Sequence, residues 1–265
     1  MSRNARRSTQ ERRAALLRLL RDGTTRVDEL ADVMSVSAST VRRDLEHLTS
    51  DGLVARTYGG ALVPDNFRER SITESEMVRR DAKAAIAQAA LRLMPRQGAV
   101  FIDAGTTCGA LAELLVEAEA PQQRIVVTRG LETAVTLTAS ERIHVTILGG
   151  EIRSLSHGSV GPLTDLALDR LSFTIAYLGA DAVRPDRGVG EPTLEETMVK
   201  ERIAASAQQV VVLADSSKLR TPQTPAWARL EPEWTLITDT DAPGDLEKEC
   251  DQAGVRLIRA DPAAH

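Results

Sequence analysis

The sequence predicts an α/β protein, with an N-terminal winged helix-turn-helix followed by a mostly parallel α/β sheet that has helices on both faces. Three observations predict this fold. Residues 1–63 show short amphipathic helices with one tight turn and then a Gly-Gly hairpin. From Gly98 onward, short apolar runs alternate with helical stretches, which is typical of a parallel sheet covered on both faces. A length of 265 residues suits two domains, expected at residues 1–63 and 81–265 with a linker over residues 64–80.

Composition excludes several protein classes. The chain is 42% hydrophobic and 27% charged, and none of its apolar runs approaches the roughly 20 residues that a membrane helix needs. No membrane partner is therefore expected. Cys108 and Cys250 lack metal-ligand spacing and indicate free thiols in a reducing, cytoplasmic setting. The four histidines are scattered, so neither a metal site nor a cofactor is expected.

Charge is distributed unevenly along the chain. Residues 1–63 carry 11 arginines and 8 acidic residues, a balance of +3, whereas the rest carries 22 basic and 30 acidic residues, a balance of −8. A small cationic domain on an acidic body favours nucleic-acid binding by the first domain. Only four lysines occur in the chain: Lys83, Lys200, Lys218 and Lys248.

The first two helices are expected over about Gln10 to Arg21 and within Thr24 to Met34. The side chains expected to be buried are Leu16, Leu17, Leu20, Leu30, Ala31 and Met34. A three-residue turn, Ser35-Val36-Ser37, then leads to the next helix, with Val36 filling the gap between the two. Two short helices joined by a tight turn form a helix-turn-helix unit.

The stretch from Val36 to Leu45 has the pattern of a recognition helix. Ser37 is a good N-cap, and Val41, Leu45 and Leu48 recur on one buried side. Ala38, Ser39, Arg42 and Arg43 fall on the opposite side, where small residues can approach bases and arginines can reach guanine edges or phosphates. An ordinary amphipathic helix with a solvated Arg-Arg pair remains an alternative for this stretch alone.

A two-stranded wing is expected over Leu53 to Val63. It turns at Gly59-Gly60, and Arg56 and Tyr58 are placed to contact the DNA backbone or the minor groove. A helix-turn-helix followed at once by a Gly-Gly wing is more specific than either feature alone, so double-stranded DNA is the expected partner.

A long helix is expected to run to about Met94, with Ile86, Ala87, Ala90 and Leu91 on its apolar face. The expected strands after it are Ala99 to Asp103, Arg124 to Thr128, His144 to Gly150, Phe173 to Gly179, Gln209 to Asp215, Trp234 to Asp239 and Val255 to Ala260. Since ligands of parallel sheets bind at the carboxyl ends of strands, a ligand site is expected there.

Polar clusters follow four of these strands. Asp103 ends the first of these strands and is a candidate ligand contact. Gly105, Thr106 and Thr107 open the helix after it and would form an anion cradle, although a plain capped turn is an alternative. Gly149 would allow close backbone approach, and Arg153 could clamp a phosphate. The third cluster has Asp181 at a strand end and Glu195, Glu196 and Lys200 on the next helix. The fourth cluster has Asp215 and Lys218.

The N-terminal motifs resemble the DeoR family of bacterial transcription regulators. The resemblance rests on ELADVMSVSASTVRRDLEHL (Glu29 to Leu48) and GLVARTYGGA (Gly52 to Ala61). It implies that the helix with Arg42 and Arg43 enters the major groove. We expect Ser39 and Arg42 or Arg43 at base edges, Thr40 and Arg56 at phosphates, and Asp44 orienting Arg43 or another nearby arginine, with a simple surface acid as the alternative.

The C-terminal strings DAGTT, LGADA, VKERI and VLADSSK resemble the effector domain of the same family, which is similar to ribose-5-phosphate isomerase. The resemblance implies a phosphorylated sugar as the ligand, with Gly105, Thr106 and Thr107 holding phosphate and Asp181, Lys200 and Lys218 holding hydroxyls. Two departures bear on the ligand: Arg129 stands where the family commonly has Asn, and the segment Val189 to Thr193 has Glu191 where Thr residues are common. Arg129 could add an anion contact, and Glu191 could exclude an anion.

The expected function is a sequence-specific DNA-binding regulator, a repressor of a carbohydrate-metabolism operon that a phosphorylated sugar releases. A homodimer or higher homo-oligomer is expected, since one recognition helix covers one half-site. An activator is an open alternative. Another is a sugar-phosphate isomerase with an accessory nucleic-acid-binding domain, but Leu178 replaces an acid of the isomerase motif and no matching lysine follows Asp181. No catalytic residue is therefore assigned.

Overall fold

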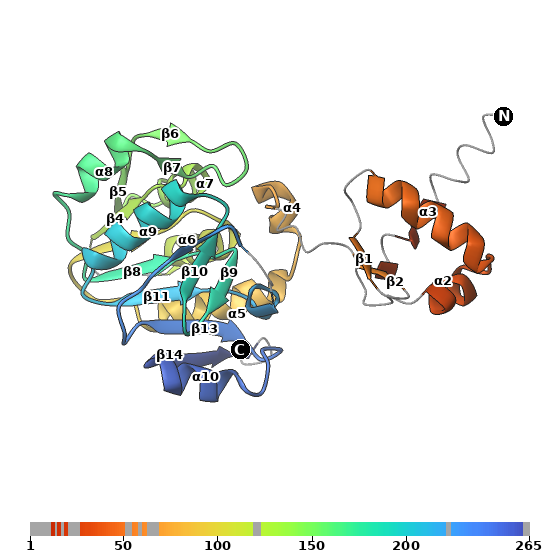
Figure 1. Cartoon of the computed structure of the whole chain (residues 1–265). Helices are drawn as coiled ribbons and strands as arrows, with labels where there is room; N and C mark the ends of the chain where they lie inside the picture. The colour runs from red at the N-terminus through yellow and green to blue at the C-terminus, as the bar shows by residue number, and fades with distance from the viewer. Residues whose placement is uncertain are drawn as a thin grey trace. The chain divides into compact units, whose positions relative to one another are not determined.

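The computed structural model divides into two compact units, Met1–Asn66 and Phe67–His265, which are described separately (Figure 1). It describes residues 12–13, 15–16, 19–20, 27–50, 55–57, 60–62, 69–118, 123–220 and 224–261.

The first unit contains the predicted helix-turn-helix. Helix α2 (Val27–Met34) and helix α3 (Ala38–Ser50) are separated by three residues, as expected. Their apolar sides form one core, whose buried members include Leu16, Leu20, Leu30, Ala31, Val41, Leu45 and Leu48. Val36 and Met34 are partly buried against this core. Leu17 and the ends of the first helix lie outside the described residues.

The predicted wing is present as two short strands. Strand β1 (Ala55–Thr57) pairs antiparallel with β2 (Gly60–Leu62), and Thr57 lies opposite Gly60. Gly60, expected in the turn, is therefore the first residue of β2, and residues 58 and 59 between the strands lie outside the described residues.

The second unit is built on a seven-stranded sheet in the order β14-β13-β11-β8-β3-β4-β5 (Figure 1). Every neighbouring pair is parallel, as predicted. The strands are β3 (Ala99–Ile102), β4 (Arg124–Thr128), β5 (Ile143–Ile147), β8 (Ile175–Leu178), β11 (Val210–Leu213), β13 (Thr235–Asp239) and β14 (Arg256–Ala260). Each lies within one residue of a predicted apolar run or inside it.

Helices cover both faces of this sheet, as expected. One face packs against α5 (Arg80–Leu91), α6 (Thr106–Glu117) and α7 (Leu131–Leu137), and the other against α8 (Pro162–Leu168), α9 (Leu194–Ala205) and α10 (Leu246–Ala253). Neighbouring residues of a strand point to opposite faces. Thus Val100 joins the core under α5 and α6, whereas Phe101 joins the core under α9 and α10.

Several short elements differ from the sequence prediction. Strands β9 (Ala182–Arg184), β10 (Gly188–Glu191) and β12 (Ala226–Ala228) form a separate antiparallel sheet, with β10 in the middle. Strands β6 (Glu151–Ile152) and β7 (Ser159–Val160) form a second small pair. These strands have at most four residues, too few to show an apolar periodicity. A short 3₁₀ helix, η1 (Ser216–Arg220), follows β11.

The predicted linker also differs from the structure, because residues 69–80 pack as part of the second unit. Helix α4 (Ile72–Glu76) begins with a capping box between Ser71 and Glu74, and the amide of Ile72 donates to the carbonyl of Leu155 at 2.8 Å. We call residues 69–79 the strap. A polar composition suggested a loose linker, but these polar groups are used in caps and ion pairs.

The strap ends at Arg79, which has a left-handed backbone (φ 55°) just before α5. Its guanidinium lies 2.8 Å from carboxylate oxygens of both Asp239 and Asp241 and 3.3 Å from Asp215. Non-glycine residues adopt this conformation at some cost, which surrounding contacts must offset. The three carboxylates therefore fix the end of the strap to the sheet.

Candidate effector pocket and DNA-contacting helix

Helix α3 presents the predicted DNA-contacting side chains opposite its buried stripe. Ser39, Arg42 and Arg43 are exposed, and Thr40 is half-buried. The hydroxyl of Ser37 accepts from the amide of Thr40 at 3.1 Å, which confirms the N-cap. It also lies 2.8 Å from the hydroxyls of Ser39 and Thr40. The start of the helix therefore carries a small hydroxyl cluster, with two exposed arginines in the next turn.

The side chain of Arg56 and the whole of Tyr58 lie outside the described residues. Their contacts with the DNA backbone or the minor groove stay predictions.

Asp44 orients arginines, as predicted, and the partners are Arg12 and Arg13 of the first helix. Its carboxylate accepts from Arg12 Nε at 2.6 Å and Arg13 Nε at 3.1 Å. Burial opposes ionisation of Asp44, but the two arginines outweigh it and lower its pKa. At 3% exposure Asp44 is no surface acid, so the expectation holds for another nearby arginine and not for Arg43.

The main pocket of the second unit lies where the sheet reverses its strand order. From β3 the chain proceeds to β4 and β5 on one side, and later returns to β8 on the other side of β3. Ligands of open α/β sheets bind beyond the carboxyl ends of strands at such a point. Asp103 follows β3 there, and Asp181 follows β8, so the predicted location of the effector site coincides with a pocket.

Asp103 lies under this pocket and binds two cations that line it, Arg129 and Lys200, and we call these three residues the buried triad. Asp103 is fully buried and accepts from Arg129 Nε and Lys200 Nζ, both at 2.6 Å. Lys200 also donates to the carbonyl of Gly179 at 2.7 Å. Burial opposes each charge, but mutual attraction outweighs it, lowering the pKa of Asp103 to about 2 and raising that of Lys200. The triad therefore joins the ends of β3 and β4 to α9 through fully ionised groups.

Three glutamates line one side of the pocket, and we call them the acid end: Glu69, Glu191 and Glu196. Arg153 makes a two-pronged pair with Glu69, with both distances 2.8 Å, and also binds Glu196. Ser156 donates to Glu196 at 3.1 Å. Arg153 therefore ties the strap, through Glu69, to helix α9.

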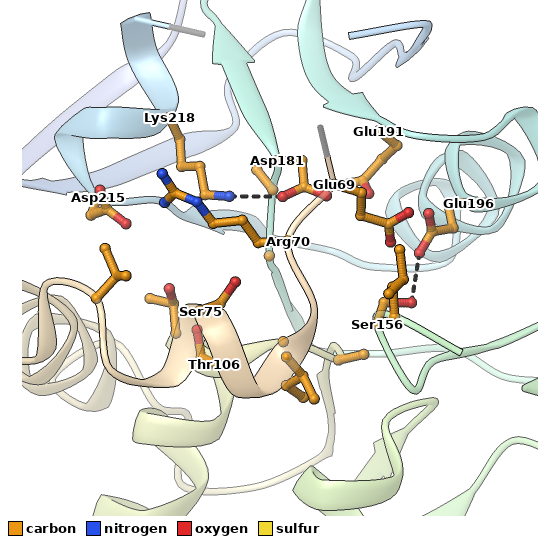
Figure 2. Close-up of a pocket in the computed structure, with 18 of the residues that line it drawn as sticks. Glu69, Arg70, Ser75, Thr106, Ser156, Asp181, Glu191, Glu196, Asp215 and Lys218 are labelled. Carbon is orange, nitrogen blue, oxygen red and sulfur yellow. Dashed lines mark hydrogen bonds and ion pairs between the residues drawn. The ribbon is translucent and has the colours of Figure 1, made fainter. Parts of the chain in front are cut away.

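The opposite side of the pocket carries cations. Arg70 and Lys218 lie there (Figure 2), with Lys83 near both, and we call these three residues the cationic end. Lys218 Nζ lies 2.7 Å from Asp181. Lys83 is 6% exposed and donates to the carbonyl of Ser75 at 2.5 Å. Its pKa is lowered, chiefly by burial. Within the described chain, no carboxylate pairs directly with Arg70 or Lys83.

The start of α6 adds backbone donors to the pocket. Gly105 is its N-cap and, having no side chain, gives the first turn no side-chain cap. Gly105, Thr106 and Thr107 all line the pocket. Uncapped amides at a helix start, with the helix dipole, attract anions. Lys83 and Lys218 line the same pocket, so their positive charges would add to the attraction for an anion bound there.

Figure 2 shows this polarity directly. Lys218 and Asp215 lie on one side, and Glu191, Glu196 and Ser156 lie on the other. The Arg70 side chain extends toward the Lys218 side, and Asp215 pairs with Arg79. The pocket is therefore suited to a molecule with an anion at one end and hydrogen-bonding groups at the other.

Most of the predicted effector residues line this pocket, namely Gly105, Thr106, Thr107, Arg129, Asp181, Lys200 and Lys218. The structure places the other three away from its lining. Asp103 lies beneath it, Arg153 supports the acid end from outside, and the carbonyl of Gly149 accepts from Thr164 at 2.8 Å. These three are therefore not part of the pocket lining, and they contact neighbouring protein groups.

Some pocket residues were not predicted from the sequence, including Glu69, Arg70, Ser75, Lys83 and Ser156. Four of these lie in the strap or in α5. The sequence signal for Lys83 is the scarcity of lysine: the chain has four lysines, and Lys83, Lys200 and Lys218 line this pocket.

In the part of the chain that the structure describes, no helix is long and apolar enough to cross a membrane. The same residues contain no group of three or more His, Cys, Asp or Glu that could hold a metal ion.

Comparisons with known proteins agree with both units. Residues 12–67 match the DeoR-like helix-turn-helix domain, and residues 78–240 match the DeoR C terminal sensor domain. The HTH-type transcriptional regulator GlpR of Haloferax volcanii is 31% identical, covering 94% of this chain and 96% of that protein. The lactose phosphotransferase system repressor of Streptococcus mutans is 30% identical over 90% of this chain and 95% of its own length.

A third relative, the glycerol-3-phosphate regulon repressor of Escherichia coli K12, is 28% identical and covers 79% of this chain and 82% of that protein. Among solved structures, ribose 5-phosphate isomerase A of Methanocaldococcus jannaschii is 19% identical, with 54% of this chain and 55% of that chain covered. Its TM-score of 0.41 is too low to carry an argument.

Proposed function

This chain belongs to the DeoR family of transcription regulators, and we propose that it is a repressor that a phosphorylated sugar releases from operator DNA. The relatives named as repressors of sugar or glycerol-phosphate systems support the sign of regulation and the class of target operon. The proposal assigns the chain no catalytic turnover.

The proposed operator contacts follow from the exposed side of α3. Ser39 and Arg42 or Arg43 would read base edges in the major groove, while Thr40 and Arg56 would hold phosphates. The Asp44 pairs with Arg12 and Arg13 support this assignment, because they hold the first helix against α3. Two copies of the chain would place two recognition helices on a two-fold operator.

The polarity of the pocket is the observation that carries the effector proposal. Arg70, Lys83 and the uncapped start of α6 offer positive potential without a direct carboxylate partner in the described chain. A phosphate would compensate that potential, and a sugar attached to it would extend toward Ser156 and Glu191. The paired Lys218 and Asp181 would meet the hydroxyls between the two ends.

We further propose that the strap transmits the signal. Glu69, Arg70 and Ser75 of the strap line the pocket, and the strap directly follows the DNA-binding unit in the chain. A ligand regulates only if it binds one arrangement better than the other, so its contact with Arg70 must differ between the DNA-competent and the released state. The ion pair between Glu69 and Arg153 is the contact that such a change would break or make.

Fluorescence anisotropy with DNA from upstream of the gene tests the proposal. We expect salt-sensitive, sequence-selective binding that a panel of phosphorylated sugars weakens and the unphosphorylated sugars do not. Lys83→Gln should retain DNA binding and lose the response, whereas Lys248→Gln, on the exposed side of α10, should behave as the unsubstituted protein. DNA binding that no phosphorylated sugar alters would refute the effector part of the proposal.

A further inference from the structure

The acid end of the pocket contains one carboxylate more than its cations can compensate. Together with Asp103 beneath them, Glu69, Glu191 and Glu196 make four acids, which face three cations: Arg129, Arg153 and Lys200. Arg153 serves both Glu69 and Glu196, and Asp103 receives hydrogen bonds from the other two cations. The carboxylate left over is that of Glu191.

Glu191 is buried, lines the pocket and lacks a hydrogen bond at one oxygen. It is 4% exposed, and its Oε1 has no hydrogen-bond partner. Lys200 Nζ lies 3.0 Å from that oxygen but is not aligned for a hydrogen bond, since it is directed to Asp103 and Gly179. A buried oxygen without a hydrogen bond is costly, so a ligand group that donates one to it gains affinity.

The backbone holds Glu191 in this position. It lies on β10, the middle strand of the small sheet, opposite Ala226 of β12. At the preceding Gly190, a Cβ would lie 2.2 Å from Thr224 Oγ1 and 3.0 Å from Ala182 Cβ. This close packing and the pairing of β10 on both sides fix the backbone that carries Glu191, and the side chain lines the pocket from there.

The groups around Glu191 determine whether its carboxyl group is protonated when no ligand is bound. Burial, together with the nearby charges of Asp181 and Glu196, raises the pKa of Glu191 to about 8, against the opposing effect of Lys200 and Arg129. At neutral pH the carboxyl therefore holds a proton. A ligand hydroxyl would leave that proton in place, whereas a ligand ammonium would donate to the carboxylate and displace it.

We propose that the acid end binds an ammonium group through Glu191, so that the effector is an aminated sugar phosphate, with its phosphate at the cationic end. The inference rests on the proposed effector function and names the ligand class for the same pocket. The ammonium supplies the positive charge that the acid end lacks, and the phosphate meets Arg70, Lys83 and the start of α6. A zwitterionic ligand thus matches both ends of the pocket.

Isothermal titration calorimetry with matched ligand pairs tests this inference. The probes are 2-amino-2-deoxyhexose 6-phosphates and the corresponding hexose 6-phosphates, titrated at pH 7 in two buffers of different ionisation enthalpy. We expect the amino member of a pair to bind about tenfold more tightly or better, because a hydrogen bond to a charged group is gained. We also expect release of about one proton, from Glu191.

Glu191→Gln has the shape of the protonated acid and should fold normally, which thermal melting checks. This variant should lose both the preference and the proton release, while Glu195→Gln, an exposed residue on α9, should retain both. Equal or weaker binding of the amino members, or no binding by any of them, overturns the inference. Inorganic phosphate reports on the cationic end separately: if it binds the full chain but not Lys83→Gln, the proposed function stands even when the ammonium inference fails.

Discussion

The buried triad and the cationic end of the pocket are built from the same kinds of side chain but use their charges differently. In the triad, Asp103 compensates Arg129 and Lys200 at 2.6 Å, away from solvent. At the cationic end, Arg70 and Lys83 have no direct carboxylate partner within the described chain. The first unit repeats the contrast, since Asp44 pairs with Arg12 and Arg13 whereas Arg43 is exposed. Compensated charges fix the architecture, and accessible ones are available to ligands.

Removing one member of the triad should have the largest effect. Arg129→Met should lower the free energy of unfolding by about 3–5 kcal/mol, because the buried carboxylate of Asp103 then loses one of its two cationic partners. Urea denaturation followed by circular dichroism measures this. Arg256→Met, at an exposed position of β14, should change the stability by less than about 0.5 kcal/mol. A loss for Arg129→Met no larger than that of this control would show that the triad does not support the fold.

Removing an exposed arginine of α3 should affect DNA binding and not stability. Arg42→Ala or Arg43→Ala should weaken operator binding by about 1–3 kcal/mol for each lost two-pronged base contact. Anisotropy measures the affinity and urea denaturation the stability. Unchanged affinity in both variants would mean that this side of α3 does not face the DNA.

Lys218 lies between the two classes, since it pairs with Asp181 yet lines the pocket. Lys218→Ala should leave operator binding intact and raise the effector concentration needed for release by about tenfold, or about 1.4 kcal/mol. A dose–response curve of operator release measures the shift, with Lys248→Ala as the control. If Lys218→Ala responds at the normal concentration, the pocket is misassigned.

The pH dependence of stability separates the two acids with opposite pKa shifts. The pKa of Glu191 is raised to about 8 in the folded chain, so the native state binds more protons than the unfolded state from about pH 4.5 to 8. Stability therefore falls as the pH rises through this window, by at most about 1.4 kcal/mol per pH unit. Glu191→Gln should flatten that slope in urea titrations. Asp103, with its pKa lowered to about 2, contributes stability that is lost only as the pH falls from about 3.8 toward 2.

The parallel sheet could be predicted from the sequence because its central strands, β3, β8, β11 and β13, are buried on both faces and read as continuous apolar runs. Strand β4 matches its predicted bounds at both ends. The strap and strand β10 could not be predicted in this way, since their order comes from Arg153, Arg79 and a close packing at Gly190, which are separated widely in the sequence. The edge of the sheet where the pocket lies, at the carboxyl ends of the strands, could be predicted from strand direction alone.

The individual roles in the pocket were harder to predict than its location. Arg129 lines the pocket, where it could add an anion contact, but its guanidinium also donates to Asp103, 26 residues earlier in the chain. Asp103 was expected to contact the ligand because it follows a strand at the same edge of the sheet, but its side chain is fully buried. A sequence shows that a charged residue follows a strand, but not whether another charge has already compensated it.

Because lysine is scarce in this chain, amine labelling can report how much of the protein has ligand bound. Three of its four side-chain amines belong to the pocket lining, and the fourth, Lys248, is exposed on α10. An amine-reactive label read by mass spectrometry would therefore use Lys248 as an internal reference for the reagent. Protection of Lys218 relative to Lys248 would then measure the fraction of chains that carry ligand, without DNA and without a reporter gene.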